Sequence, residues 1–305
     1  MSELIDIHTV SVYKLALDGG FTCPNRDGTV GTGGCIFCSG SGSGDFSVPV
    51  GDDTRRALDD AAALVESKNP SGKYIAYFQS YTGTYAPAAR LRELFTAALE
   101  PDCIAALAVA TRPDCVGDDV IALLSELNEL KPVWVELGLQ TVHPDTARYI
   151  RRGYELPVFD DAVRRLKSAG IEVVVHMMIG LPGESDEMIY RTAEYIGRSG
   201  ADGIKFHLLH VLTGTDLASE YEKGRFETLS LEKYIELLEG CIRRIPADMV
   251  VHRLTGDGAK RELIAPLWSA DKKTGAERCK RSLRQRRSRT GLAFFQIIIV
   301  LFSAL

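Results

Sequence analysis

The sequence of 305 residues predicts an α/β fold in which six strand–helix units form a partial (β/α)6 barrel of the TIM type. Three observations lead to this prediction. Apolar, β-branched segments alternate with segments of helical periodicity. The predicted strands are almost continuously hydrophobic, as expected for a parallel sheet covered on both faces. The units recur roughly every thirty residues, and six units fall short of the eight that close a TIM barrel.

The elements follow in order along the chain. The first strand, VSVYKLAL at 10–17, precedes a loop rich in cysteine and glycine, which leads into a helix over about 52–67. A glycine closes one of the later helices, as is common at helix C-termini. The remaining strands are predicted at 73–78, 103–110, 133–139, 171–180 and 202–209, and the remaining helices at 87–100, 118–130, 157–170 and 184–200.

We expect one catalytic domain over residues 1–268, with a short C-terminal extension, and an atypical tail over 269–305. Within the tail, residues 271–290 carry nine Lys or Arg and two acids, and the run GLAFFQIIIVLFSAL at 291–305 is apolar. That run is shorter than the roughly 18–20 residues of a membrane span. It could be a core strand, a partner-binding segment, a marginal anchor or an altered chain end. We favour an altered end and assign it no function.

Composition and charge limit the classes of function. The chain is 45% hydrophobic and 25% charged, with a net charge of −5, which is ordinary for a globular protein. No cleavable apolar leader follows Met1, so we expect a cytoplasmic protein with reduced thiols. Residues 271–290 carry a net charge of +7, so the rest of the chain carries −12. This negative charge argues against non-specific nucleic-acid binding, although a local basic patch could hold a structured RNA.

The unusual residues of the chain follow the predicted strands. In parallel α/β sheets, functional loops lie at the carboxyl ends of the strands. We therefore expect one face of the sheet to carry the site. The loops in question are the cysteine loop and the segments QSYTGTY, TRPD, QTVHPD, GLPGES and HVLTGT.

Three cysteines, Cys23, Cys35 and Cys38, lie in the first of these loops. The C-x-x-C spacing of the last two lets both thiolates reach one metal centre. A zinc site usually takes four ligands, so zinc would need a distant residue here, and a redox C-x-x-C would not need Cys23. Three thiolates can instead bind three irons of a 4Fe–4S cluster and leave the fourth iron open.

Several motifs, in this order, resemble one family of enzymes. They are GFTCPNRDGTVGTGGCIFC, AYFQSYTGTYAP, ATRPDC, ELGLQT and VHRLTGDG. On these motifs the chain, from about residue 5 to Trp268, resembles the radical S-adenosylmethionine (SAM) superfamily, and within it the YhcC-like subgroup. That subgroup is related to the Elongator catalytic subunit and to the oxygen-independent coproporphyrinogen oxidases.

The resemblance implies two cofactors, a 4Fe–4S cluster and SAM. Cys23, Cys35 and Cys38 would hold the cluster, whose open iron takes the amino and carboxylate groups of SAM. One electron, from a donor such as flavodoxin or ferredoxin, would break the sulfonium C–S bond and give methionine and a 5′-deoxyadenosyl radical. Phe37 would shield the cluster or pack near the adenine.

The resemblance also implies SAM contacts at the strand ends. Gln79 and Ser80 take the place of a glycine-rich motif that cups the methionine amino group. Gln140 and Arg152 match positions that the coproporphyrinogen oxidase relatives use for SAM, and arginine suits a carboxylate because its planar donors bind it bidentately. His176 stands where those relatives place a ribose-binding acid.

Other residues near the strands are weaker candidates. Gly180, in IGLPGE, would let the backbone approach the adenine. Glu136 lies inside a strand, where unpaired acids are rare, and we expect it to contact SAM or substrate in the barrel lumen. His207 and His210 could face the substrate or be structural. His252, Arg253 and Asp257 lie in a predicted turn that closes the barrel or touches the substrate.

The sequence thus predicts a radical SAM enzyme, and the Elongator relationship makes a tRNA base, especially a wobble uridine, the expected substrate. A small metabolite or a protein side chain is an alternative substrate. A different class of function also stays open, namely a zinc- or cluster-binding interaction module without catalysis.

Overall fold

The computed structural model describes residues 12–42, 44–69, 72–256 and 260–270. Its centre is a curved, parallel sheet in the strand order β2-β1-β3-β4-β5-β6-β7-β9. A separate antiparallel pair joins two short strands. The sheet strands are β1 (Tyr13–Asp18), β2 (Val48–Pro49), β3 (Tyr74–Phe78), β4 (Ile104–Thr111), β5 (Val133–Gln140), β6 (Glu172–Ile179), β7 (Gly203–Leu208) and β9 (Val250–Arg253), and the pair is β8 (Val211–Leu212) with β10 (Leu263–Ala265).

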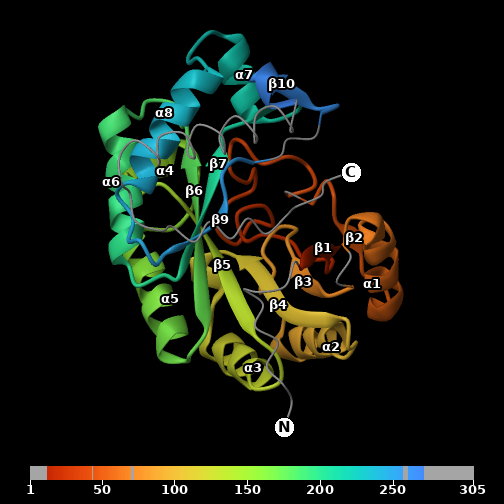
Figure 1. Cartoon of the computed structure of the whole chain (residues 1–305). Helices are drawn as coiled ribbons and strands as arrows, with labels where there is room; N and C mark the ends of the chain where they lie inside the picture. Colours follow the sequence, from red (N-terminus) through yellow and green to blue (C-terminus); the bar gives the residue numbers. More distant parts are fainter. Residues whose placement is uncertain (1–11, 43, 70–71, 257–259, 271–305) are drawn as a thin grey trace.

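The helices cover the outside of this sheet. Figure 1 shows α1, α2, α3, α5 and α6 following one another around its convex side. Serine side chains cap two of the helices: Ser185 accepts from the backbone N–H of Met188, and Ser230 from that of Lys233. The helices are α1 (Thr54–Ala63), α2 (Ala88–Leu99), α3 (Asp118–Asn128), α4 (Pro144–Tyr149), α5 (Leu156–Ser168), α6 (Asp186–Arg198), α7 (Asp216–Glu222) and α8 (Leu231–Ile242), with 3-10 turns at Glu66–Lys68, Pro113–Cys115 and Leu267–Ala270.

The predicted α/β class with a parallel, partial barrel is confirmed, and each of the six predicted strands is present. The segment expected to form a turn with His252 and Arg253 differs, because residues 250–253 form β9, which pairs in parallel with β7. Helices α4, α7 and α8 were not expected. Asp257 and the tail over 271–305 lie outside the described residues.

Two layers of apolar packing hold the sheet. The larger one fills the space between sheet and helices, where for example Phe78 of β3 and Phe95 of α2 lie with ring centroids 5.0 Å apart. The smaller one fills the inside of the barrel with eight buried residues. These are Val12, Ile75, Tyr77, Ala106, Ala108, Ala110, Trp134 and Val174.

Inside the barrel, small and large side chains alternate between neighbouring strands. Ala108 of β4 lies in register with Tyr77 of β3 on one side and with Trp134 of β5 on the other. The alanine leaves the volume that the two rings fill, so the layer packs without crowding. This layer forms the apolar floor beneath the polar residues described next.

Candidate active site

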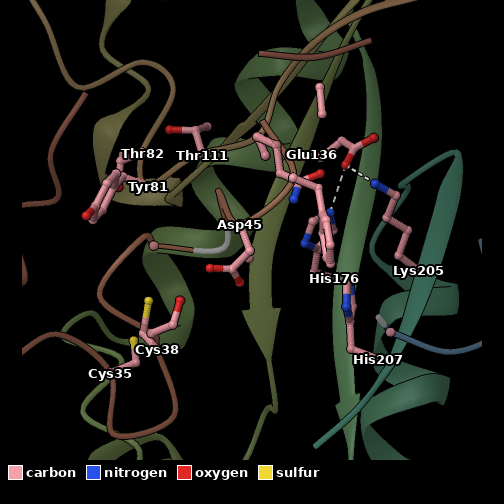
Figure 2. A pocket seen from close by; sticks show the side chains of 18 of the residues that line it. Cys35, Cys38, Asp45, Tyr81, Thr82, Thr111, Glu136, His176, Lys205 and His207 are labelled. Carbon is pink, nitrogen blue, oxygen red and sulfur yellow. Dashed lines mark hydrogen bonds and ion pairs between the residues drawn. The ribbon is translucent and has the colours of Figure 1, made fainter. Parts of the chain in front are cut away.

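A cavity of ≈ 310 Å³ lies inside the barrel, above this floor and under the loops that follow the strands. Its size is near the lower end for small-molecule sites. Figure 2 shows Cys35 and Cys38 on one side of it and Glu136, His176, Lys205 and His207 on the other. The predicted site residues that line it are Cys23, Cys35, Cys38, Phe37, Gln79, Glu136, Gln140, Arg152, His176, His207, His210 and Arg253.

The three predicted cluster ligands converge on this cavity. Each is a free, half-buried cysteine. A tight turn brings the last two together, because the backbone N–H of Cys38 donates to the carbonyl of Cys35 at 3.0 Å. The Arg26 guanidinium donates to the carbonyls of Cys38 at 3.1 Å and Ser39 at 2.5 Å, which fixes a cation beside the thiols.

The donor set fits an iron–sulfur cluster better than a single metal ion. Among the described residues, no three His, Cys, Asp or Glu side chains lie close enough to hold one ion, as a zinc site requires. A cluster places its ligands on separate irons, so its thiolates stand farther apart. Cys23, Cys35 and Cys38 nevertheless face the same cavity, and this arrangement fits the cluster.

Distant parts of the chain anchor the cysteine loop. The side-chain amide of Asn25 donates to the carbonyl of Arg151 at 2.5 Å. The backbone N–H of Ile36 donates to the carbonyl of Ile150 at 3.2 Å, and the carbonyl of Ile36 accepts from Leu217 at 2.9 Å. The loop is therefore positioned by the segments after β5 and β8 as well as by the bonds within the loop itself.

Positive charge faces the thiols. Burial raises the pKa of the Cys35 thiol to about 12, and the nearby guanidinium of Arg112 acts against that rise. Arg112 is itself buried and forms an ion pair with Asp114 at 2.7 Å. Since a metal centre binds thiolates and not thiols, the positive charge of Arg26 and Arg112 beside the cysteines is compatible with an anionic cluster.

Glu136 lies at the centre of the opposite wall. Its Oε1 accepts from Lys14 Nζ at 2.5 Å and from Trp134 Nε1 at 3.1 Å. Its Oε2 accepts from Tyr77 at 2.8 Å, and it also contacts His176 Nε2 at 2.9 Å and Lys205 Nζ. A carboxylate has about four lone-pair sites, so five donors leave Glu136 little capacity to bind SAM or substrate directly.

The charges of this group follow from its partners. Burial raises the pKa of Glu136, but Lys14 and Lys205 outweigh burial and hold that pKa well below its usual value. Burial lowers the pKa of His176 to about 4, against the opposing bond to Glu136. At neutral pH the imidazole is therefore uncharged. Because an ionised carboxylate only accepts, the proton of His176 is on Nε2, and Nδ1 is left as an acceptor.

Backbone strain gathers beside the cavity. Gln140 has φ 68° at the end of β5, where the register with β6 shifts, and Tyr81 has φ 53° in the loop after β3. Both residues line the cavity. Non-glycine residues in this conformation cost energy and cluster at functional sites, which supports the loop ends as the binding edge.

The structure gives Arg152 a different task from the expected carboxylate contact. Its Nη1 donates to the carbonyls of Leu139 at 3.2 Å and Thr141 at 2.7 Å, and its Nε and Nη2 donate to that of Tyr154 at 3.1 and 2.9 Å. Four of its five N–H groups are thus bound to backbone. Arg152 holds the strained turn around Gln140, and a bidentate grip on a SAM carboxylate would require those bonds to break.

Two predicted residues do not line the cavity. Ser80 is 1% exposed, and its hydroxyl has no hydrogen-bond partner among the described residues. Gly180 has φ 97°, and a Cβ there would lie 3.0 Å from Leu229. The glycine is therefore explained by its backbone and by the close approach of Leu229.

Sequence reasoning missed the lysines of the Glu136 group. Lys14 in YKLALD and Lys205 in GIKFHL are single charges inside apolar strands. A lysine in a buried strand is rare unless it is paired, and that signal was available for both. Their partner could not be found from the local pattern, because it lies 122 and 69 residues away.

Comparisons with known proteins identify the family. Residues 26–196 match the sequence model of the Radical SAM superfamily, and residues 201–285 match that of the Radical_SAM C-terminal domain. The second match extends past Trp268 into the segment expected to be atypical. None of the described helices is both long enough and apolar enough to cross a membrane.

Whole-length relatives agree with these matches. The chain is 46% identical over 285 residues to the uncharacterized protein YtqA of Bacillus subtilis, covering 93% of this chain and 88% of YtqA. It is 38% identical over 275 residues to protein YhcC of Escherichia coli, covering 90% and 88%. A tRNA uridine(34) acetyltransferase of Methanocaldococcus jannaschii is 28% identical over 161 residues, covering 52% of this chain and 29% of that enzyme.

Solved structures share the fold. Elp3 of Methanocaldococcus infernus superposes with a TM-score of 0.68 at 18% identity, covering 91% of this chain and 63% of that chain. Coproporphyrinogen III oxidase (HemN) of Escherichia coli superposes with a TM-score of 0.51 at 14% identity, covering 79% and 53%. With the superfamily match over 26–196 and the identity to YtqA, these likenesses show that the protein is an enzyme of the radical SAM superfamily.

Proposed function

We propose that the protein binds a 4Fe–4S cluster through Cys23, Cys35 and Cys38 and acts with SAM on a tRNA base, in particular a wobble uridine. The observation that supports this most is the convergence of the three cysteines on the cavity that also holds the Glu136 group. When bound there, cluster and SAM supply one-electron cleavage of the sulfonium C–S bond to a 5′-deoxyadenosyl radical. The electron would come from a donor such as flavodoxin or ferredoxin.

The residues of the chain bind the cluster and SAM and orient them. Arg26 and Arg112 offset the negative charge of the cluster. Gln79 and Gln140, at the ends of β3 and β5, offer amide groups to the polar end of SAM. His176, held with its proton on Nε2, offers Nδ1 as an acceptor to a ribose hydroxyl, the task that an acid performs in the coproporphyrinogen oxidase relatives. Glu136 is in this scheme a positioning residue for His176.

Apolar side chains complete the wall of the cavity. Phe37, Met178, Leu209 and Leu212 line it and exclude water, which protects a radical from side reactions. The choice of a tRNA base is supported by two relatives that are named as tRNA uridine(34) acetyltransferases. Each matches about half of this chain, and this chain covers 29% of each of them. The proposed tRNA substrate therefore rests on that relationship, whereas the proposed radical chemistry rests on the residues of the site.

The test is an anaerobic reaction of the reconstituted, reduced protein with SAM and total cellular RNA. We expect 5′-deoxyadenosine to form and one RNA nucleoside to change mass, and both products are measured by liquid chromatography and mass spectrometry. Cys35→Ala should abolish the iron–sulfur absorbance and 5′-deoxyadenosine formation. Cys103→Ala is the matched control and should retain both, because this half-buried cysteine directly precedes β4, at the amino end of the strand and away from the loops that line the cavity.

The outcomes separate the alternatives. One zinc and no iron in anaerobically prepared protein would favour a zinc-binding module and contradict the proposal. Cleavage of SAM without any change in RNA nucleosides would keep the radical chemistry and remove tRNA as the substrate.

A further inference from the structure

The wall of the cavity opposite the cysteines carries cations that the proposed chemistry does not use. Lys14 of β1, Lys205 of β7 and Arg253 of β9 all line the cavity. Arg253 lies near enough to the two lysines to lower the pKa of each. One strand near one end of the sheet order, β1, and two strands at the other end, β7 and β9, therefore direct positive charge to the same cavity.

The two lysines meet at one carboxylate. Their side chains are 0% and 1% exposed, and both Nζ atoms bond to Glu136. Burial lowers the pKa of Lys205 well below its usual value, although Glu136 acts against this. Buried charges are costly unless they are paired. A further negative group on this wall would stabilise both ammonium groups.

His207 gives an independent indication of a ligand. Its ring lies 4.8 Å from that of His176, between centroids, and its Nε2 is buried with no hydrogen-bond partner among the described residues. Burial lowers the pKa of His207 well below its usual value, so the ring is neutral and one nitrogen carries a proton. A buried polar atom without a partner is costly, and an oxygen ligand beside it would remove that cost.

Small residues leave room in front of this wall. Ala16 of β1, Ala110 of β4 and Gly138 of β5 line the same cavity. Larger side chains at these three positions would fill part of the cavity that the lysines also line. The barrel thus combines cationic groups with open volume, as a site for a small charged group requires.

We propose that Lys14, Lys205, His207 and Arg253 bind an oxyanion of the substrate, either a carboxylate or a phosphate. The inference rests on the proposed function only in that it places the substrate in this cavity. It narrows the substrate class, because a neutral base alone would leave these groups unused. A nucleotide phosphate or a carboxylate of a small co-substrate would occupy them.

The test measures anion binding through Trp134, whose Nε1 donates to Glu136. The chain has two tryptophans, so Trp268→Phe leaves Trp134 as the fluorescent reporter. Sodium acetate and sodium phosphate are titrated into the full-length protein, with sodium chloride at matched ionic strength as reference. We expect a saturable change of emission with acetate, with phosphate or with both, and none with chloride.

Three variants locate the site. Lys205→Met should weaken binding roughly tenfold or more, as expected for a lost bond to a charged group, and the other four donors to Glu136 remain to keep the fold. Glu136→Gln should tighten binding because it removes the competing carboxylate, with folding checked by circular dichroism. Lys233→Met, the same change at a lysine on the outer helix α8, should have no effect.

Each result of these titrations supports or contradicts the proposed oxyanion site. Binding of acetate alone assigns a carboxylate, and binding of phosphate alone assigns a phosphate. An equal response to chloride, or equal affinities of the Lys205→Met and Lys233→Met proteins, would overturn the inference. SAM cleavage is measured separately. A protein that binds the anion but never cleaves SAM would contradict the proposed function and leave the oxyanion site in place.

Discussion

Glu136 is bonded to five side chains, namely those of Lys14, Tyr77, His176 and Lys205 on other strands and that of its neighbour Trp134. The bond to His176 has the most direct chemical result. Burial keeps the imidazole neutral against this bond, and the bond fixes its proton on Nε2, so that Nδ1 is an acceptor. A protonated ring would repel the sulfonium of SAM. The state of His176 is thus set by burial and by a carboxylate on the adjacent strand.

His176→Gln should flatten the pH dependence of stability between about pH 4 and 6.5. The unfolded chain protonates this imidazole near pH 6.5 and the folded chain near pH 4. As the pH falls, the unfolded state therefore binds the proton first, and the free energy of unfolding decreases, by roughly 3 kcal/mol in full. Glutamine keeps an N–H for Glu136 and does not titrate.

The measurement is urea unfolding at a series of pH values. The pH dependence of the free energy of unfolding should become weaker in this variant without vanishing. His207 and His252 also have lowered pKa values, and so do Lys14 and Lys205. His143→Asn, whose ring contacts the Met188 carbonyl outside the barrel, controls for loss of a histidine. Equal slopes for His176→Gln and the wild type would show that His176 does not carry this effect.

At the scale of elements, β4 determines how much space the barrel interior has. Its inward Ala108 lies in register with the large rings of Tyr77 and Trp134 on the two adjacent strands. Ala108→Leu should therefore destabilise the protein by about 1–3 kcal/mol, because three added carbons meet Tyr77 and Trp134. Urea unfolding measures the change. Ala89→Leu, at an exposed position of α2, is the matched control, and equal stability of the two variants would contradict this account.

The elements that could be predicted from the sequence are those with a strong local pattern. The six strands were found because each is an apolar run with few polar interruptions. Strand β9 was not found, since it has four residues and two of them are His252 and Arg253. The cysteines carried their own spacing signal. The task of Arg152 carried none, because it depends on carbonyls that are exposed only when the turn around Gln140 has formed.

At the scale of the whole molecule, the two matched family regions share one sheet. Strand β6 lies in the first region and β7 in the second, and they pair over six residues from Val174 to Ile179. The cavity draws residues from both regions. The second region is therefore a wall of the site and not an accessory unit beside it.

The anchoring of the cysteine loop by distant segments has a consequence for how the protein is made. The ribosome releases the cysteines early, but the Asn25 bond reaches a residue 126 positions later, which takes about 6–25 s to synthesise at roughly 5–20 residues per second. During that interval the thiols belong to an unanchored loop, open to oxidation or to stray metals. On the proposed function, a cluster can enter a positioned site only after the anchoring segments that follow β5 and β8 have been translated.

Nascent chains stalled on the ribosome can show this order. In chains stalled once residue 140 has emerged, the loop thiols should react with maleimide much faster than in chains stalled after residue 256 has emerged, both without a cluster. Cys103→Ala and Cys115→Ala in both chains confine the signal mainly to the loop. Equal rates would mean that the loop orders itself. Slower labelling of the longer chain would mean that these three thiols need protection in the cell until the segments after β5 and β8 have been synthesised.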